Sequence, residues 1–202
     1  MGEDSPVLVL ASASAVRKTL LENAGLEILT KPTAIDEKEI KAALKVEGAS
    51  AAQAAETLAE LKAQRVAAGH AGALVIGCDQ LLDCEGVWFD KPTDRATAAA
   101  QLATLAGRSH VLETAVCVVH DGHRIWHHNA RATVTLRRLP EATIARYLEA
   151  VGAAALDSVG AYQLEGLGAQ LIEQVEGDFF TVLGLPLLPL LQFLRDRGAL
   201  PR

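Results

Sequence analysis

Residues 8–18 read Leu-Val-Leu-Ala-Ser-Ala-Ser-Ala-Val-Arg-Lys, which begins as a short apolar strand and turns into a helical pattern. The backbone N–H groups of a helix N-terminus are unpaired and carry partial positive charge. Ser12 and Ser14 add hydroxyl groups, and Ser14 is also suited to cap the helix. Arg17 and Lys18 add two cations in the first turn. The stretch predicts a strand–turn–helix unit that either binds an anion or simply carries basic residues on its surface.

The composition indicates one globular domain, because the 202-residue chain is 50% apolar and shows no internal repeat or linker. The formal net charge of −6 argues against a general nucleic-acid binder, which needs surplus cations. The three cysteines form no CxxC pair, so neither a disulfide framework nor a zinc site is expected. The acidic first residues predict no signal peptide. The longest apolar run, 182–194, is too short and interrupted to cross a membrane. We therefore expect a cytoplasmic protein with neither a membrane nor a nucleic-acid polymer as partner.

A second informative stretch, residues 73–82, is almost continuously apolar and predicts a central strand buried on both faces. Asp79 interrupts this run. A carboxylate at the end of a buried strand is costly unless it is paired, hydrogen-bonded or bound to a metal, although capping a turn is the alternative role. Lys62 lies on the Ala-rich helix predicted for residues 51–68, and Lys91 lies on a later loop. Each of these cations faces either solvent or a cleft.

The remaining pattern predicts a mixed β-sheet covered by helices. The β-rich runs 111–119 and 124–136 flank Asp121-Gly122, a good hairpin signal. Further helices are expected at residues 38–47, 95–105, 139–151 and 187–195, and further strands at 26–29 and 169–175. Four histidines crowd the hairpin, but their spacing matches no standard metal-ligand pattern.

Short motifs follow one another along nearly the whole chain, from about Val7 to Leu194. They are Leu10-Ala11-Ser12-Ala13-Ser14 with Arg17-Lys18, Ile35-Asp36-Glu37, Leu58-Ala59-Glu60-Leu61-Lys62-Ala63, Val75-Ile76-Gly77-Cys78-Asp79-Gln80, Lys91-Pro92, Gly107-Arg108-Ser109-His110, Gly160-Ala161-Tyr162, Glu165-Gly166-Leu167-Gly168 and Gly184-Leu185-Pro186-Leu187. Each motif is weak alone, but the ordered set is specific. It resembles the Maf family of nucleoside triphosphate pyrophosphatases, historically called septum formation inhibitors.

The resemblance implies an α/β fold like that of inosine triphosphate pyrophosphatases, with an elongated mixed β-sheet flanked by helices. Residues 1–202 would form a single domain with two lobes and a central cleft. The implied reaction is divalent-metal-dependent cleavage between the α- and β-phosphates of a nucleoside triphosphate, which gives a nucleoside monophosphate and pyrophosphate. The family also implies a homodimer.

Site residues follow from the resemblance position by position. Those that match the phosphate-binding loop and the basic active-site positions are Ser14, Arg17, Lys18, Lys62 and Lys91. Asp79 matches the residue usually named as proton acceptor, and Glu37 matches a second acidic position. Because Mg²⁺ prefers carboxylates together with phosphate oxygens and water, Glu37 and Asp79 are the expected ligands of Mg²⁺, Mn²⁺ or Co²⁺. Asp79 therefore acts either as general base or as metal ligand.

Departures from the family pattern indicate which nucleobase the substrate carries. Where the usual loop reads Ser-Pro-Arg-Arg, Ala15 replaces the proline and Val16 replaces the first arginine. Many members have Asp-Thr and Gln-Gly where this chain has Gln80 after Asp79 and Glu165 before a glycine. The Thr/Gln version belongs to the branch acting on dTTP and UTP, whereas Gln80 with Glu165 looks more like the 7-methyl-GTP branch. Val16 is not the aromatic residue that this branch tends to have.

Chemistry favours a purine, because a carboxylate accepts well from the adjacent N1–H and N2–H₂ groups of guanine and suits the cationic 7-methylguanine ring. A glutamine serves either kind of base, so Glu165 is the main reason for preferring 7-methyl-GTP or a related nucleotide. The alternatives are a dTTP/UTP pyrophosphatase, a house-cleaning enzyme with broad base tolerance, and a non-catalytic nucleotide-binding regulator of septum formation.

Overall fold

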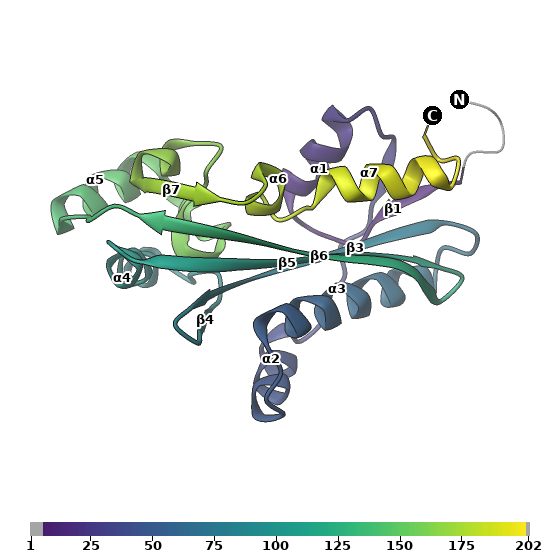
Figure 1. The fold of residues 1–202 in the computed structure, drawn as a ribbon, viewed down its shortest axis with the longest axis horizontal. Coiled ribbons are helices and arrows are strands. Elements are labelled where there is room, and N and C mark those ends of the chain that lie inside the picture. Colours follow the sequence, from purple (N-terminus) through teal and green to yellow (C-terminus); the bar gives the residue numbers. More distant parts are fainter. Residues whose placement is uncertain (1–5, 201–202) are drawn as a thin grey trace. The chain divides into compact units, whose positions relative to one another are not determined.

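The computed structural model describes residues 6–200, which form a β-sheet flanked by helices (Figure 1). The strands are β1 (Leu8–Leu10), β2 (Ile28–Thr30), β3 (Leu74–Cys84), β4 (Val87–Phe89), β5 (Ser109–His120), β6 (His123–Leu136) and β7 (Ile172–Glu176). The helices are α1 (Ala15–Asn23), α2 (Glu37–Val46), α3 (Ala51–Ala67), α4 (Arg95–Leu105), α5 (Glu141–Val151), α6 (Phe179–Val182) and α7 (Leu187–Asp196), with 3-10 segments η1 (Gly152–Leu156), η2 (Val159–Ala161) and η3 (Leu167–Leu171).

The strand order is β2-β1-β3-β5-β6-β7, and β4 pairs with β3. β1 runs parallel to β2 and β3, whereas β4 is antiparallel to β3 and β7 is antiparallel to β6. The sheet is therefore mixed. The predicted α/β fold, with a mixed sheet flanked by helices, is confirmed.

The described chain gathers into two compact units. The first unit contains the chain up to Gln80, the segment Thr114–Ala130 and the chain from Gly184 onward. The second unit contains Leu81–Glu113 and Arg131–Leu183. Strands β3, β5 and β6 each contribute residues to both units.

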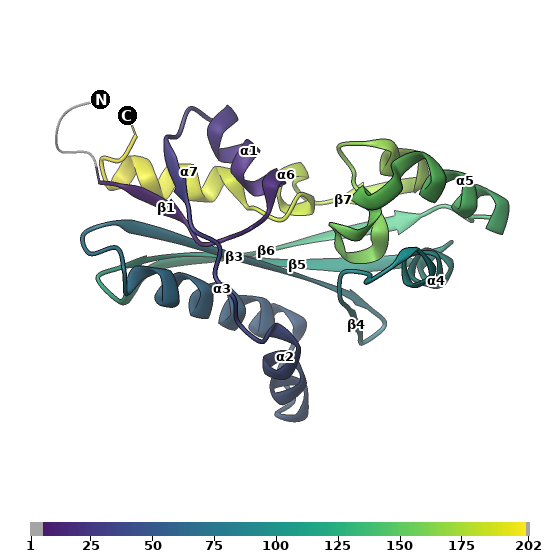
Figure 2. The same ribbon diagram turned by 180° about the vertical axis from the view of Figure 1, so that it is seen from behind.

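In the first unit helices cover both faces of the sheet: α1 and α7 lie on one face and α3 lies on the other (Figure 1, Figure 2). Alanine side chains allow α3 to approach β3 very closely. A Cβ atom added to Gly77 of β3 would lie 2.1 Å from the carbonyl oxygen of Ala59 and 2.8 Å from Cβ of Ala63. This close approach brings Lys62 of α3 to the strand that carries Asp79.

We expect Gly77→Ala to lower the free energy of unfolding by about 3 kcal/mol, because α3 must move away from the added methyl group. Urea denaturation measures this loss. Gly69→Ala is the matched control, since the nearest atom to its added Cβ is the Val66 carbonyl oxygen at 3.9 Å. We expect the control to stay within about 0.5 kcal/mol of the parent. Equal stability of the two variants would show that the contact of α3 with β3 is not tight.

The turn between β5 and β6 has the geometry that its sequence predicts. Asp121 has φ 47° and Gly122 has φ 79°, so both central residues are left-handed. Such turns match the right-handed twist of the strands that they join. The predicted hairpin is confirmed.

The second unit has its own apolar core. Helix α4 contributes Leu102 and Leu105, the sheet contributes Leu112 and Val134, and α5 contributes Tyr147. Within residues 6–200 no helix combines the length and the apolar character needed to cross a membrane.

Two local predictions are wrong. Asp79 does not lie at the end of a strand, because β3 continues to Cys84, where Leu82 pairs with Phe89 of β4. Residues 169–171 belong to η3 rather than to a strand, and β7 begins only at Ile172. The chain turns back tightly there, since a Cβ on Gly168 would lie 2.5 Å from the backbone of Gln163.

Candidate active site

The loop between β1 and α1 surrounds the start of α1 with hydroxyl groups. The Ser14 side chain caps the helix by accepting a hydrogen bond from the Arg17 backbone N–H at 3.3 Å. The Ser14 backbone N–H in turn donates to Oγ of Ser12 at 3.2 Å. Ser12 is buried, whereas Ser14 is half-buried. The predicted cap is confirmed, and Ser14 is the more accessible of the two hydroxyls.

Arg17 is fixed by three acceptors from separate parts of the chain. Its Nε donates to the carbonyl oxygen of Gly184 at 2.7 Å. Its Nη1 donates to the carbonyl oxygen of Cys78 at 2.9 Å and to Oγ of Ser12 at 3.3 Å. Because a guanidinium carries five N–H groups, these bonds orient Arg17 and leave it donors beyond the three that are used. Gly184 has φ +88°, a conformation that glycine adopts without strain.

Arg17 contacts β3 just beyond the point where β1 stops pairing with that strand. The pairing between β1 and β3 ends at Leu10 opposite Ile76. Two residues further on, the Cys78 carbonyl oxygen accepts from Arg17. Asp79 and Gln80 follow directly, and neighbouring residues of a strand point to opposite faces. Beyond the end of β1 the Cys78 carbonyl is therefore bonded by Arg17, whose charge acts on the neighbouring Asp79.

Lys62 joins the two acidic residues of the site. Its Nζ lies 2.5 Å from Oδ1 of Asp79 and 2.7 Å from Oε1 of Glu37. Lys62 and Asp79 are 8% and 4% exposed, so this ion pair is buried, whereas Glu37 at the start of α2 is half-buried. The structure thus brings together three of the predicted residues, which lie on α2, α3 and β3.

The two carboxylates differ in proton affinity. Burial raises the pKa of Asp79 above its ordinary value, against the opposing charges of Lys62 and Arg17. Burial also raises the pKa of Glu37, but the ammonium groups of Lys62 and Lys41 outweigh it, and the net pKa is lowered. Of the two, Asp79 is the one poised to take up a proton.

The donor set fits a metal ion that is shared with a substrate. Within residues 6–200, no three His, Cys, Asp or Glu side chains gather closely enough to hold a metal by themselves. No described residue donates a hydrogen bond to the buried Oδ2 of Asp79. Mg²⁺ is commonly bound by one or two carboxylates together with substrate phosphates. Asp79 and Glu37 supply such a pair, with one buried oxygen still unsatisfied.

The other predicted residues lie on α1 or in the second unit. Lys18 is exposed on α1 and pairs with Glu22 at 3.6 Å. Val16 is half-buried in the first turn of α1. Lys91 and Glu165 belong to the second unit, and both are exposed.

Sequence reasoning missed Thr114, whose Oγ1 accepts a hydrogen bond from Nε2 of Gln80 at 2.8 Å. Nothing in the pattern of β5 marks Thr114, because a threonine inside a strand is ordinary. The motif containing Gly184 was recognised, but its contact with Arg17 was not.

The buried His110 in the second unit was also missed as an interacting residue. Its Nε2 lies 2.6 Å from the hydroxyl of Tyr162, and burial lowers the pKa of His110 to about 4. His110 is therefore neutral at physiological pH and links β5 to the loop after η2.

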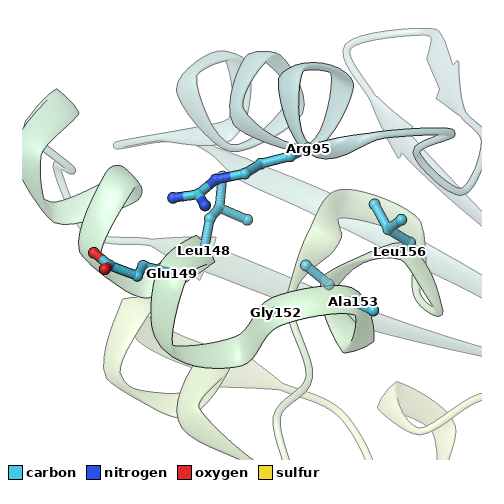
Figure 3. Close-up of a pocket in the computed structure, with 7 residues that line it drawn as sticks. Arg95, Leu148, Glu149, Gly152, Ala153 and Leu156 are labelled. Carbon is cyan, nitrogen blue, oxygen red and sulfur yellow. The ribbon is translucent and has the colours of Figure 1, made fainter.

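A cavity of about 230 Å³ lies in the second unit beside α4, α5 and η1 (Figure 3). Its lining includes Leu148, Ala155 and Leu156, with the charged groups of Arg95 and Glu149. None of the predicted site residues lines this cavity, so it shares no residue with the cluster around Lys62.

Comparison with known proteins gives the family. The family described as Maf-like protein matches residues 7–197. A "Nucleoside triphosphate pyrophosphatase" of Paramagnetospirillum magneticum is 53% identical over 95% of this chain and 99% of its own length. A "7-methyl-GTP pyrophosphatase" of Rhizobium meliloti is 48% identical over 96% of this chain and 98% of its own length. A solved dITP/XTP pyrophosphatase from Mycobacterium abscessus is 19% identical, with a TM-score of 0.46 over 95% of this chain and 93% of that one. The predicted resemblance is confirmed: the chain belongs to the family of Maf-like proteins.

Proposed function

We propose that the whole chain acts as one catalytic domain, a nucleoside triphosphate pyrophosphatase that hydrolyses the bond between the α- and β-phosphates. The observation that carries this proposal is the buried Asp79, bonded to Lys62 and left with one unsatisfied oxygen beside Glu37 and Arg17. The names of two relatives about half identical in sequence describe the same class of hydrolase.

The residues of the first unit suit the binding of a polyphosphate. Arg17 has N–H groups beyond those bound to Gly184, Cys78 and Ser12, and Ser14 presents a hydroxyl at the start of α1. An ammonium group carries three N–H donors, so Lys62 can donate one to a phosphate oxygen while it holds Asp79 and Glu37. Lys91 and Lys18 are the further cations that we assign to the β- and γ-phosphates. Hydrolysis of a triphosphate depends mainly on such positioning and charge stabilisation.

Proton transfer is the role of Asp79. In the proposed reaction a water molecule attacks the α-phosphorus, its proton passes to Oδ2 of Asp79, and the bond from the α-phosphorus to the bridging oxygen breaks. Pyrophosphate then leaves with the electron pair of that bond. A carboxylate whose pKa is raised by burial is a stronger base than an exposed one. If Asp79 instead acts as a metal ligand, a divalent metal held by Glu37 and Asp79 would polarise the phosphate oxygens.

We further propose a guanine-type base, 7-methyl-GTP or a relative of it, as the preferred substrate. The support is chemical: Gln80 and Glu165 both offer oxygen acceptors, which suit the N1–H and N2–H₂ edge of guanine. Relatives named nucleoside triphosphate pyrophosphatase and relatives named 7-methyl-GTP pyrophosphatase have similar sequence identity to this chain, for example 49% and 48%. A homodimer and a cytoplasmic location stay predictions.

The purified protein should be assayed against 7-methyl-GTP, GTP, dTTP and UTP with Mg²⁺, Mn²⁺ or Co²⁺, scoring pyrophosphate and phosphate separately. We expect one pyrophosphate for each monophosphate, with the highest kcat/KM for 7-methyl-GTP. Chelation of the metal should abolish release. Phosphate alone would place the cleaved bond elsewhere, and no product from any triphosphate would favour a non-catalytic regulator. A preference for dTTP or UTP would overturn the proposed base while leaving the reaction intact.

A further inference from the structure

The guanidinium of Arg17 is bonded through two of its three nitrogen atoms. Nε donates to the Gly184 carbonyl oxygen at 2.7 Å. Nη1 donates to the Cys78 carbonyl oxygen at 2.9 Å and to Oγ of Ser12 at 3.3 Å, which uses both of its N–H groups. Within residues 6–200 no group accepts a hydrogen bond from Nη2. The two N–H groups of Nη2 are therefore the pair that Arg17 can offer to a phosphate.

Gly184 lies directly against this guanidinium. A Cβ atom added to Gly184 would be 3.2 Å from Nη2 and 3.3 Å from Nε of Arg17. Because non-bonded atoms have their best separation at about 3.5–4.0 Å, the guanidinium would have to shift. The same Cβ atom would be 3.6 Å from Oε1 of Gln80, which is an ordinary contact. An added methyl group at Gly184 would thus press on Arg17 rather than on Gln80.

The backbone around Gly184 is held more firmly than the side chain of Arg17. Leu185 and Leu187, which lead into α7, are 0% and 4% exposed, so apolar burial anchors this segment. Gly184 itself has φ +88°, a conformation that is strained for any residue with a Cβ atom. Arg17 is only half-buried. The guanidinium is therefore the part that would move if Gly184 carried a side chain.

We propose that Gly184 is a positioning residue for phosphate binding: its carbonyl oxygen and its lack of a side chain hold Arg17 so that Nη2 is the end presented to substrate. The proposal rests on the proposed function, in which Arg17 binds a phosphate. Hydrogen bonds from a guanidinium to a phosphate are strong and depend on orientation. The phosphates are the same in every nucleoside triphosphate. Gly184 should therefore affect all triphosphates equally, whatever base they carry.

Gly184→Ala tests the proposal, with Gly25→Ala as the matched control. Gly25 has φ +82°, so both substitutions place alanine in the same strained conformation, but no atom lies within 4 Å of a Cβ atom on Gly25. We expect Gly184→Ala to lower kcat/KM about ten- to a hundredfold, the range for one hydrogen bond to a charged group. The control should stay within about twofold of the parent. The loss should be equal for 7-methyl-GTP and UTP, and a loss confined to one base would overturn the proposal.

Arg17→Lys shows whether Gly184 acts through the guanidinium, because it removes that group and keeps a positive charge. In this background Gly184→Ala should cost less than about threefold, since no guanidinium is left to displace. The full loss in both backgrounds would show that Gly184 does not act through Arg17. If Gly184→Ala cannot be purified, Gly184→Asn takes its place with Gly25→Asn as control, because asparagine carries a Cβ atom but tolerates positive φ.

Binding measured without turnover separates this inference from the proposed reaction. Calorimetry with the α,β-methylene analogue of GTP should show an affinity about ten- to a hundredfold lower in Gly184→Ala and unchanged in Gly25→Ala. Wild-type protein that releases no pyrophosphate, together with this loss of affinity, would refute the proposed reaction and support the role of Gly184. Active wild-type protein, together with an unchanged affinity in Gly184→Ala, would do the reverse.

Discussion

Replacing Asp79 by asparagine is expected to lower the rate of pyrophosphate release about a thousandfold. Asparagine has nearly the same shape, but its amide carries no charge and cannot take a proton from water. Lys62 keeps Glu37 as a partner at 2.7 Å, so the variant should fold, and circular dichroism with a thermal melt will check this. The measurement is pyrophosphate release at saturating Mg²⁺ with 7-methyl-GTP.

Asp83→Asn is the matched control for this substitution, because Asp83 lies four positions further along the same strand. Its carboxylate accepts from the Gly86 backbone at 2.8 Å and from Nε1 of Trp88 at 3.1 Å. We expect its activity to stay within about twofold of the parent, since its hydrogen bonds stay within the β3–β4 turn. If Asp79→Asn kept more than a tenth of the parent rate, Asp79 would be neither the base nor an essential metal ligand. Recovery of activity at raised Mg²⁺ concentration would favour metal binding over proton transfer.

Replacing Lys62 by methionine is expected to cost about 3–5 kcal/mol of stability near neutral pH, because Asp79 would be left buried without its counter-ion. The pKa of Asp79 is already raised by burial and would rise further without Lys62. A raised pKa means that the folded state binds the proton more tightly than the unfolded state. The extra destabilisation should therefore shrink as the pH falls and be lost below the ordinary pKa of 3.8, where Asp79 is protonated in both states.

The same substitution should change catalysis in a recognisable way. The acid limb of the kcat/KM profile should move to higher pH, because Asp79 must lose its proton before it can act as a base. At pH 7 we expect a loss of at least about a hundredfold, since a phosphate-binding cation is also removed. Lys41→Met is the control, because Lys41 pairs with the same Glu37 at 3.8 Å across one turn of α2. An acid limb that did not move in Lys62→Met would contradict the coupling of Lys62 to Asp79.

Local structure was largely predictable from the sequence. The β5–β6 hairpin, the serine cap of α1 and the long helix α3 each depend on residues close together in the chain, which leave a periodic or turn-forming pattern. The extent of β3 was not predictable, because the strand is prolonged by its pairing with β4 rather than by its own pattern. Likewise the first three residues of the strand expected at 169–175 belong to a 3-10 segment, beside the tight approach of Gly168 to Gln163.

Residues 8–18 show the same difference between what local sequence determines and what tertiary contacts determine. By itself the sequence determined that a strand leads through two serines into a helix with Arg17 in its first turn, because strand, cap and helix are set by neighbouring residues. Only the tertiary structure decided what Arg17 touches, since its partner Gly184 lies 167 positions away. It also decided that one lysine contacts both acidic residues and that Gln80 donates a hydrogen bond to Thr114. Hydrogen bonds and ion pairs of this kind join side chains across separate elements, and no local pattern records which elements meet.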